Sequence, residues 1–406
     1  MKIYYVFTSA GLKTSSVQQK VLNQIKSLKK YGVDCKGLFF TTDNVNDEHD
    51  DFQFISVPKI KKGWFRSFRQ RRAIHKTLLN WFKKNRPEFD YIYCRYPGAS
   101  FELAKWLKTY RKKIFIEHVT SETYEIKLYR KENPLRFNLS SWLGNLEFYY
   151  LPLLSEWLYG RIIRANAAFG ISNSEDIAEY ENKRAKRNYN LLIGGDSVKV
   201  SDFQIRTIAT EPKRLHLLFL KGASTIADFN GLDRVIKGIA NYKGDWNIKL
   251  YIFGKSLENE IKLAMDLRIS DKVIAGGYIE KKDLDKLIGQ IDLGLGAFGI
   301  FRKGLKSTTI IKAREYFARG LPYIYGHNDP DISGHNELKN CCLELPCDDS
   351  DIDFNVVVEW YSQIKDLNAT AEFMRQYAIE NLDYDVKMRR LINFLITYNR
   401  SNTNNS

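Results

Sequence analysis

Long hydrophobic runs and cysteines are both scarce in this sequence. Its 406 residues contain no stretch of about 18 consecutive apolar residues, so we expect no segment that crosses a bilayer. The apolar opening at residues 1–7 is too short for the hydrophobic part of a signal peptide, and no cleavage site follows it. We therefore expect a cytoplasmic protein.

The five cysteines are an odd number, and none has the paired spacing of a zinc site. Cys35 and Cys94 lie within apolar, strand-like runs, which is typical of buried thiols in a reducing compartment. Glycine and proline are not enriched, and only residues 401–406 have the composition of a disordered segment. The chain is longer than one hydrophobic core usually serves, which favours two domains of roughly 200 residues each.

Acidic residues are missing from the segment Lys59–Arg86, although the whole chain has a net charge of +15. This segment holds eleven basic residues with Trp and Phe residues between them. Three interpretations stay open: a solvated or core helix, a nucleic-acid surface, or an anionic membrane surface. We favour the membrane, because Trp and Phe rings can sink to headgroup depth and no nucleic-acid-binding motif is present. A second aromatic segment, residues 142–159, ends near Arg161 and Arg164 and supports this interpretation.

Short apolar runs alternate with amphipathic helical patterns along the chain. Strands separated by helices favour parallel, doubly wound sheets, because parallel neighbours need a crossover connection. The rhythm lapses near residues 201–212 and then restarts with near-continuous apolar runs, as buried parallel strands should have. The predicted strands are Ile3–Thr8, Lys36–Phe40, Phe52–Val57, Tyr91–Arg95, Ile114–His118, Ala167–Ser172, Asn190–Ile193, Leu215–Leu220, Ile248–Phe253, Lys272–Ala275, Ile291–Ala297 and Tyr323–Tyr325.

The predicted fold class is α/β, with two Rossmann-like doubly wound domains that face a cleft. Ligands of such sheets bind outside the carboxyl ends of the strands, so the cleft is the expected site. We place the N-terminal domain at residues 1–205 and the C-terminal domain at residues 206–380. A helix and polar tail at residues 381–406 complete the chain, with the helix expected to pack back on the N-terminal domain.

The sharpest local signal is the segment Lys306–Pro322. It offers hydroxyls and backbone amides where a helix, Thr309–Arg319, is predicted to begin, and the positive end of the helix dipole suits a phosphate. Gly320 ends that helix. The alternative is an ordinary capped surface helix, which gives no reason for Glu315 to stand among apolar neighbours. The residues expected at this anion site are Ser307, Thr308, Arg302, Lys303, Lys306 and Lys312.

Glu315 and the seven residues after it, Glu-Tyr-Phe-Ala-Arg-Gly-Leu-Pro, resemble the second half of the Glu-x7-Glu signature of family 4 retaining glycosyltransferases, which have the GT-B fold. The resemblance extends over residues 215–322 and, more weakly, over the N-terminal half. It implies that Glu315 binds the ribose hydroxyls of a nucleotide-sugar donor. It also implies donor contacts at Gly222 after a strand, at Asn230 where a helix begins, and at Tyr278 in the loop that contacts the base.

Three charged positions of the family pattern are missing from this chain. The first acid of the signature falls at Ser307, and Ala223 and Asn230 stand where family members usually carry Arg and Lys. Because stabilisation of a leaving diphosphate requires positive charge, we expect the basic residues around the helix start to supply it. Asp-x-Asp pairs, which a metal-dependent transferase would use at a strand end, here open a helix or lie in an acidic loop. No metal or other cofactor is therefore required.

In the N-terminal half, two residues are candidates for the site. Gly11 follows the first strand and would let its loop approach a ligand closely. His118 ends a strand at the ligand-binding edge; a lone His is more often structural, but the family commonly has a His here that hydrogen-bonds the donor sugar. The resemblance therefore favours a catalytic role for His118. Weaker strand-end candidates are Arg95, Glu117 and Ser172.

The resemblance implies a retaining glycosyltransferase of the hexosyltransferase type, which moves a sugar from a nucleoside-diphosphate sugar to an acceptor hydroxyl. The donor would bind the C-terminal domain and the acceptor the N-terminal domain. The aromatic and basic N-terminal surface favours a lipid-linked saccharide acceptor in the assembly of a bacterial surface polysaccharide such as capsule. The protein would then be peripheral on the inner face of the cell membrane. Two alternatives stay open: another GT-B enzyme such as a nucleotide-sugar 2-epimerase, and a non-catalytic protein that binds an anionic surface.

Overall fold

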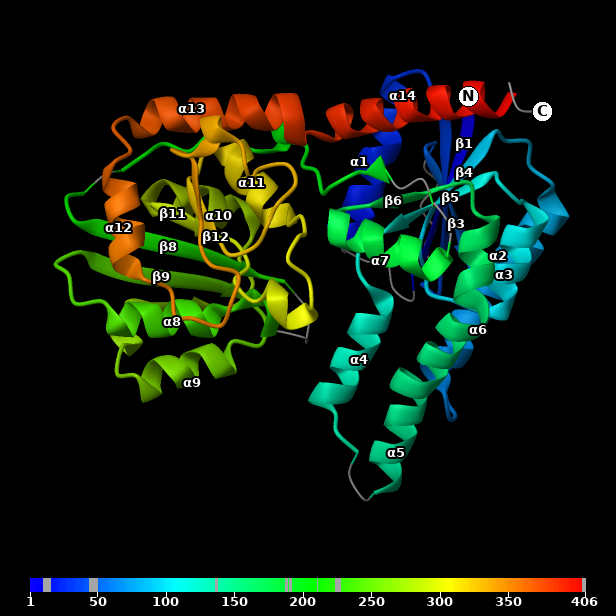
Figure 1. The fold of residues 1–406 in the computed structure, drawn as a ribbon, viewed down its shortest axis with the longest axis horizontal. Coiled ribbons are helices and arrows are strands. Elements are labelled where there is room, and N and C mark those ends of the chain that lie inside the picture. The colour runs from blue at the N-terminus through cyan, green and yellow to red at the C-terminus, as the bar shows by residue number, and fades with distance from the viewer. Residues whose placement is uncertain are drawn as a thin grey trace. The chain divides into compact units, whose positions relative to one another are not determined.

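The computed structural model divides the chain into two compact units, each built on a parallel sheet (Figure 1). Unit 1 comprises Met1–Gly194 and Lys387–Ser406, and unit 2 comprises Gly195–Val386. The structure describes residues 1–9, 16–43, 50–135, 138–186, 189, 192–209, 211–222 and 228–403.

Unit 1 alternates strands and helices. Its strands are β1 (Lys2–Ser9), β2 (Asp34–Thr41), β3 (Phe52–Ser56), β4 (Tyr91–Arg95), β5 (Ile114–His118), β6 (Gly170–Ser172) and β7 (Leu192–Ile193). Its helices are α1 (Ser16–Lys30), α2 (Arg66–Asn85), α3 (Phe101–Thr109), α4 (Glu122–Glu132), α5 (Leu139–Asn145), the π-helical turn η1 (Leu146–Tyr150), α6 (Leu151–Asn166), α7 (Glu175–Ala185) and most of α14 (Tyr384–Thr403). The sheet order is β3-β2-β1-β4-β5-β6-β7, with every neighbour parallel.

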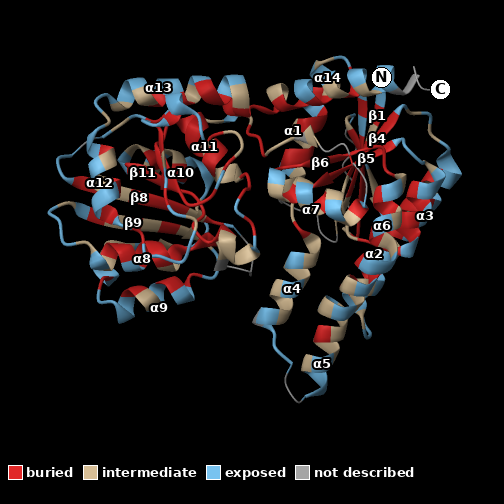
Figure 2. Cartoon of the chain, viewed as in Figure 1, coloured by how far each residue is buried: buried red, intermediate tan, exposed pale blue. Residues whose placement is uncertain are grey.

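Two apolar clusters enclose the sheet of unit 1, one on each face. Alternate residues of β1 point to opposite faces, as the period of a strand requires. Ile3 and Tyr5 join the cluster with α1 and α14, whereas Val6 joins the cluster with α2, α3 and α6. The strands in the middle of the unit are accordingly the most deeply buried part of it (Figure 2). This is the doubly wound arrangement that the sequence predicts.

Unit 2 repeats the same plan. Its strands are β8 (Arg214–Lys221), β9 (Asn247–Gly254), β10 (Val273–Gly276), β11 (Leu293–Leu295), β12 (Tyr323–Tyr325) and β13 (Cys342–Glu344). Its helices are α8 (Leu232–Asn241), α9 (Glu258–Asp266), α10 (Lys281–Leu287), α11 (Ile311–Arg319), α12 (Phe354–Ser362), α13 (Leu367–Tyr377) and the π-helical turn η8 (Ala378–Leu382), with short 3-10 turns at Val200–Asp202, Asp228–Asn230, Ser270–Lys272, Ile288–Gln290, Ile300–Lys303 and Asn336–Leu338. The parallel order is β10-β9-β8-β11-β12-β13.

The two faces of the unit 2 sheet are covered by different helices. Helices α8, α9 and α12 share one apolar cluster with the sheet, and α10, α11 and α13 share the other. The prediction of two Rossmann-like parallel-sheet domains is therefore confirmed. The strand β13 was not predicted, because its three residues are too few to show an apolar period.

The boundaries between the units differ from the predicted ones near residues 205 and 380. Residues 195–205 belong to unit 2, because Val198 pairs with Asp383 as a parallel bridge and the N–H of Val200 donates to the Asp383 carboxylate at 2.9 Å. The polar composition of residues 201–212 indicates a linker, but these pairings tie the start of that stretch to the second sheet unit. The last helix, α14, packs Met388, Leu391 and Leu395 into the core of unit 1.

A helical arm, residues 122–166, extends from the body of unit 1. It consists of α4, α5, η1 and α6, and in Figure 1 the α4 and α5 ends lie away from the sheet. None of the described helices is both long and apolar enough to cross a membrane. The arm instead leaves many large apolar side chains exposed: Tyr124, Leu135, Leu139, Trp142, Phe148, Tyr150, Leu154, Trp157 and Leu158.

Candidate functional site

The predicted anion site of unit 2 lies at the start of α11. The helix begins at Ile311, two residues later than predicted, and no side chain caps its first turn. The preceding residues run in extended form beside Asn328. The N–H of Thr308 donates to the Asn328 carbonyl at 3.0 Å, and the N–H of Asn328 donates to the Lys306 carbonyl at 2.8 Å. Ser307 pairs with Asn328 as a parallel bridge and is buried.

The Thr309 side chain, which the sequence places in the first turn, faces another segment. Its hydroxyl accepts a hydrogen bond from the N–H of Asp196 at 2.9 Å and donates to the Asp196 carboxylate at 3.2 Å. The Thr309 hydroxyl therefore holds residues 195–198 against the segment before α11. No side chain of the described residues caps the first turn of α11, so the positive end of its dipole is available to an anion.

Two contacts hold α11 in place over the sheet. Tyr316 donates hydrogen bonds from its hydroxyl to the carbonyls of Leu218 and Leu295, and a Cβ on Gly294 would lie 2.6 Å from its ring. Arg314, completely buried, forms ion pairs with Asp329 and with Asp331, the latter at 2.6 Å. These contacts fix the helix start relative to the loop that follows β12.

Lys312, in the first turn of α11, has an unusual environment. Its ammonium Nζ is buried, has no hydrogen-bond partner among the residues that the structure describes, and lies 3.5 Å from the centroid of the Phe219 ring. The residue as a whole is half-buried, so part of it is exposed while the charge is not. Burial lowers the pKa of Lys312 to about 7, although the charge of Glu315 acts in the opposite direction. An ammonium in this position can be stabilised by an anion that enters the site.

Glu315 is one turn further along the same helix and is half-buried. Burial raises its pKa, whereas the charges of Arg319, Lys281 and Lys312 lower it. Its carboxylate makes no hydrogen bond or ion pair within the described part of the chain. A half-buried carboxylate without a partner is suited to accept hydrogen bonds from hydroxyl groups of a ligand.

The other basic residues expected at this site have separate partners or positions. Arg302 forms a bidentate ion pair with Asp233 at 2.8 Å and a second pair with Asp349 at 2.6 Å. Lys303 lies 3.8 Å from the centroid of the Phe229 ring, and Lys306 is exposed. The structure thus places the buried, unneutralised positive charge at Lys312 and uses Arg302 to join α8 to the acidic loop before α12.

Three further donor-site predictions lie at loops around the sheet edge of unit 2. Gly222 is exposed just after β8, and Tyr278 is 82% exposed in the loop between β10 and α10. Asn230 is buried, and its carbonyl accepts the N–H of Phe298 at 3.0 Å. It therefore supports the loop after β11 through its backbone. The predicted Gly11 and the substituted position Ala223 lie outside the described residues.

In unit 1, His118 ends β5 as predicted but has no exposed surface. Its ring packs 5.0 Å from that of Tyr96 and 5.8 Å from that of Tyr189, measured between centroids. Its Nδ1 lies 3.6 Å from a carboxylate oxygen of Glu122 and 3.6 Å from one of Glu181. In this arrangement a substrate cannot touch the imidazole, so the predicted direct contact with a sugar needs a rearrangement of these neighbours.

His118 belongs to a buried network of charges. Three carboxylates, those of Glu122, Glu156 and Glu181, face the guanidinium groups of Arg164 and Arg184. Burial and the charge of Glu181 raise the pKa of Glu122. Burial alone would raise the pKa of Glu181, but His118 and the arginines lower it to about 2. The network encloses the buried imidazole, which fits a positioning role for His118.

The ligand atoms of His118, Glu122 and Glu181 lie within 4.8 Å of one another, close enough to hold a metal ion. The two guanidinium groups occupy the same carboxylates, however, and Arg164 donates to both oxygens of Glu181. A divalent cation would have to compete with these fixed positive charges. The donor set does not fit a resident metal.

The remaining strand-end candidates of unit 1 have structural partners. Glu117 forms a buried ion pair with Lys20 at 3.0 Å. The hydroxyl of Ser172 donates to the carbonyl of Ser174, which caps α7. Arg95 lines a pocket of about 360 Å³ that also contains Tyr96, Thr120 and other residues at the carboxyl ends of β4 and β5.

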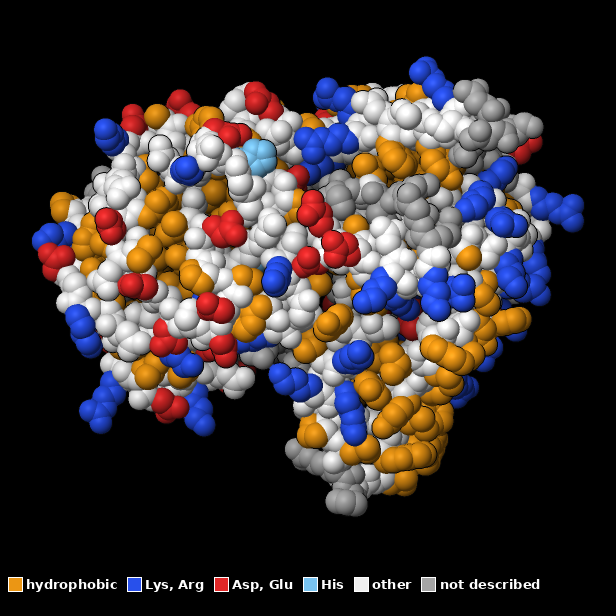
Figure 3. Space-filling model, viewed as in Figure 1, with side chains coloured by type: hydrophobic (Ala, Val, Ile, Leu, Met, Phe, Trp, Pro, Cys, Tyr) orange, Lys and Arg blue, Asp and Glu red, His pale blue; other side chains and the backbone are white. Residues whose placement is uncertain are grey.

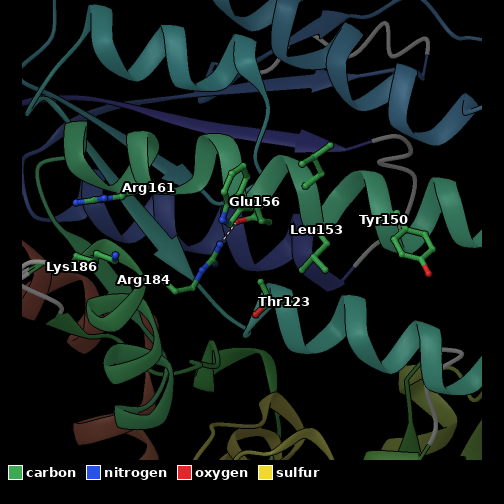
Figure 4. Close-up of a pocket in the computed structure, with 9 residues that line it drawn as sticks. Thr123, Tyr150, Leu153, Glu156, Arg161, Arg184 and Lys186 are labelled. Carbon is green, nitrogen blue, oxygen red and sulfur yellow. Dashed lines mark hydrogen bonds and ion pairs between the residues drawn. The ribbon is translucent and has the colours of Figure 1, made fainter.

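A large groove of unit 1 was not predicted from the sequence. It measures about 840 Å³ and lies between the helical arm and α7 (Figure 4). Its lining residues are Thr123, Tyr150, Leu153, Leu154, Glu156, Trp157, Arg161, Arg184 and Lys186. The aromatic segment 142–159 indicates an apolar surface, but only the tertiary structure brings Arg184 of α7 and Lys186, just after α7, to the same groove.

No protein-family model and no curated protein matches the chain. Solved structures do match it over nearly its whole length. The apo form of the lipopolysaccharide outer core galactosyltransferase WaaB aligns with 98% of this chain and 99% of its own, at 14% identity and a TM-score of 0.61. Sucrose-phosphate synthase from Thermosynechococcus elongatus aligns with 98% of this chain and 99% of its own, at 12% identity and a TM-score of 0.68.

A third similar structure contains a nucleotide sugar. HepE from Anabaena, in complex with UDP-glucose, aligns with 98% of this chain and 100% of its own, at 10% identity and a TM-score of 0.59. At such identities the likeness shows the fold alone. The fold of this chain is therefore GT-B, as the resemblance implies.

Proposed function

We propose that this protein is a glycosyltransferase that transfers a sugar from a nucleoside-diphosphate sugar to an acceptor hydroxyl. The observation that supports it best is the start of α11 in a GT-B fold. There an uncapped helix end, the buried ammonium of Lys312 and the unpartnered carboxylate of Glu315 lie within two turns of one helix. This set offers an anion site and a hydroxyl-binding group side by side.

The donor would bind in unit 2 with its diphosphate at the first turn of α11. Lys312 would stabilise the charge that develops on the leaving nucleotide, in place of the Arg and Lys that family 4 enzymes usually carry. Glu315 would accept hydrogen bonds from the ribose hydroxyls. Ser307, Thr308 and the exposed Lys306 would lie beside the diphosphate, and Gly222 and Tyr278 would approach the nucleotide from neighbouring loops. Retention of the anomeric configuration and membership of family 4 are part of this proposal.

We do not assign Arg302 or Lys303 to the diphosphate. Arg302 is neutralised by two aspartates. A ligand that bound Arg302 would have to break those ion pairs, which would weaken its binding. The transfer would need no metal cofactor, because Lys312 and the helix start supply the positive charge. We expect the same transfer rate in about 10 mM EDTA as in added Mg²⁺. A loss of activity that Mg²⁺ restores would contradict this part of the proposal.

The acceptor would be a lipid-linked saccharide in the assembly of a bacterial surface polysaccharide such as capsule, bound by unit 1 at the inner face of the cell membrane. The apolar side chains exposed on the helical arm support this (Figure 3), since a patch of this kind marks an interaction surface. The segment Lys59–Arg86 contributes positive charge. Its Trp81 and Phe82, however, pack among Tyr4, Phe89 and Trp106 of the core, so they do not face a membrane.

A ligand screen tests the donor site. We expect a UDP, GDP or ADP sugar to raise the melting temperature of the wild-type protein, and Glu315→Ala to reduce the shift. Glu372→Ala, which removes an exposed carboxylate from α13, is the matched control and should leave the shift unchanged. If no nucleotide or nucleotide sugar shifts the wild type, the proposed function is wrong.

Product analysis separates the transferase from the two alternatives. Incubation of the donor alone should yield no epimerised nucleotide sugar, whereas a 2-epimerase would produce one without an acceptor. A protein that binds anionic vesicles but no nucleotide would instead match the non-catalytic alternative. Transfer of radiolabelled sugar into a lipid-extractable product is the result that the proposal expects.

A further inference from the structure

The large groove of unit 1 has two chemically different ends. Figure 4 shows Arg161 and Lys186 at one end of it and Tyr150, with Leu153 nearer the middle, toward the other. Between them the wall is apolar, with Leu154 49% and Trp157 76% exposed. A groove with a cationic end and an apolar end matches a ligand that is itself divided into an anionic head and an apolar chain.

The cations at the polar end are free to bind. Arg161 on α6 and Lys186 after α7 are both exposed and have no ion-pair partner among the described residues. Neither of them takes part in the ion pairs of the buried charge network. They are suited to the oxygens of a phosphate.

The floor of the groove does not oppose an anion. Glu156, the only acid among the described residues that line the groove, is neutralised by Arg184 at 2.5 Å. It also accepts hydrogen bonds from Tyr96 and from the N–H of Ala99. Arg184 is itself fixed by Glu122 and Glu156. The charge that remains uncompensated around the groove is therefore positive.

We propose that this groove binds a lipid phosphate, with the phosphate at Arg161 and Lys186 and the first part of the hydrocarbon chain against Leu153, Leu154 and Trp157. The proposal rests on the function proposed above and deepens it: the groove would hold the lipid-phosphate part of the acceptor. Apolar side chains of the helical arm continue from this wall onto the exposed surface, so the rest of the chain can stay in the membrane.

Binding of a single-chain probe tests the groove directly. Dodecyl phosphate, below its critical micelle concentration, should bind to the whole protein, with dodecanol and inorganic phosphate each binding roughly tenfold more weakly or less, because each supplies only half of the interaction. The readout is calorimetry, supported by tryptophan fluorescence that Trp157→Phe reduces. The double variant Arg161→Gln/Lys186→Gln should weaken dodecyl phosphate binding by roughly tenfold or more.

Lys183→Gln is the matched control. Lys183 is an exposed lysine on α7 that does not line the groove, so its loss should leave the affinity within about twofold. Equal affinity of the wild type and the double variant, or equal binding of dodecanol and dodecyl phosphate, would overturn the proposal. So would binding to phosphatidylglycerol vesicles without any binding of the monomeric probe, since that result indicates a flat membrane contact.

The nucleotide screen and the probe experiment together distinguish a failure of the groove proposal from a failure of the proposed glycosyltransferase function. Nucleotide binding in unit 2 without probe binding in unit 1 would refute the groove and leave the glycosyltransferase. Probe binding without any nucleotide response would refute the transferase and leave a lipid-phosphate site. Each variant here replaces an exposed residue, and its melting temperature shows whether the fold is intact.

Discussion

Single residues decide the chemistry of unit 2. A lysine on an uncapped helix turn is visible in the sequence, but its burial over Phe219 is not. Arg302 is, like Lys312, a basic residue near the start of α11 in the sequence. The sequence does not show that Asp233 and Asp349 neutralise it. Because both residues are basic and near the same motif, only their surroundings separate a binding group from a structural one.

The low pKa of Lys312 predicts a pH-dependent donor affinity. An anionic diphosphate binds the charged ammonium, which predominates below pH 7 and is lost as the pH rises through about 7. Affinity for a nucleotide sugar, measured by calorimetry, should therefore fall between about pH 6 and about pH 8.5, by up to roughly tenfold per pH unit above 7.

Lys312→Met should bind more weakly at low pH and show no such fall. The diphosphate diester of a nucleotide sugar does not titrate in this range, so the ligand adds no slope of its own. Lys286→Met, which removes an exposed lysine of α10, is the control and should keep the wild-type profile. A wild-type affinity that is flat over this range would contradict the role given to Lys312.

Gly231 occupies a position where the backbone conformation requires glycine. It caps the start of α8 with φ +65°, and a Cβ there would lie 2.6 Å from the carbonyl carbon of Phe298. We expect Gly231→Ala to lower the free energy of unfolding by about 1–3 kcal/mol in urea denaturation. Gly277→Ala, with no atom within 4 Å of its added Cβ, should change it by less than about 0.5 kcal/mol. Equal effects of the two substitutions would refute this explanation.

At the scale of elements, the structure shows how α11 is held and what the helical arm exposes. The Arg314 pairs join α11 to the loop after β12, and the Tyr316 hydroxyl joins it to β8 and β11. The sequence predicts this helix and its glycine stop, because its pattern is local. It cannot predict Asp329 and Asp331 as partners, because they come from a separate segment.

Arg314→Met should destabilise unit 2 by about 3–5 kcal/mol, because it leaves the buried carboxylate of Asp329 without its counterion. Asp329→Leu alone should have a comparable effect for the converse reason. The double variant should recover part of the loss, and denaturant unfolding of all four proteins measures the coupling. Strictly additive losses would show that the pair does not act as a unit.

The exposed apolar side chains of the helical arm lead us to expect that this surface binds the membrane. Leu139→Ser/Trp142→Ser, at exposed positions of α5, should weaken cosedimentation with anionic vesicles by roughly tenfold, because two large apolar side chains no longer enter the interface. Trp64→Ser, at the exposed tryptophan of the Lys59–Arg86 segment, should have a smaller effect. The opposite ranking would place the contact on that segment instead.

At the scale of the whole molecule, the chain forms two units whose cores are separate, and it returns to the first unit at its end. Helix α14 begins in unit 2 and inserts Leu391 and Leu395 into the cluster beneath α1. The stability of unit 1 therefore depends on residues that come after all of unit 2. The last helix is therefore an integral part of the core of unit 1.

Leu395→Ala should destabilise unit 1 by about 2–5 kcal/mol, since Leu395 has no exposed surface. Amide hydrogen exchange should become faster in β1 and β6, which share this core, and stay unchanged in β8 and β9. The nucleotide response of unit 2 should be preserved. Faster exchange throughout both sheets would show that the units unfold together.

The sequence by itself determined the α/β class, most strands and the position of α11, because apolar period, helix stops and buried parallel strands are local properties of the chain. It also identified Glu315 and the helix start as a candidate site. Tertiary structure alone decided which charges are neutralised, because neutralisation depends on partners distant in sequence, such as Asp349 for Arg302 and Glu181 for Arg164. It also brought Arg161 and Lys186 to the same groove. Burial and ion pairing are properties of three-dimensional neighbours, so they could not be predicted from the order of the residues.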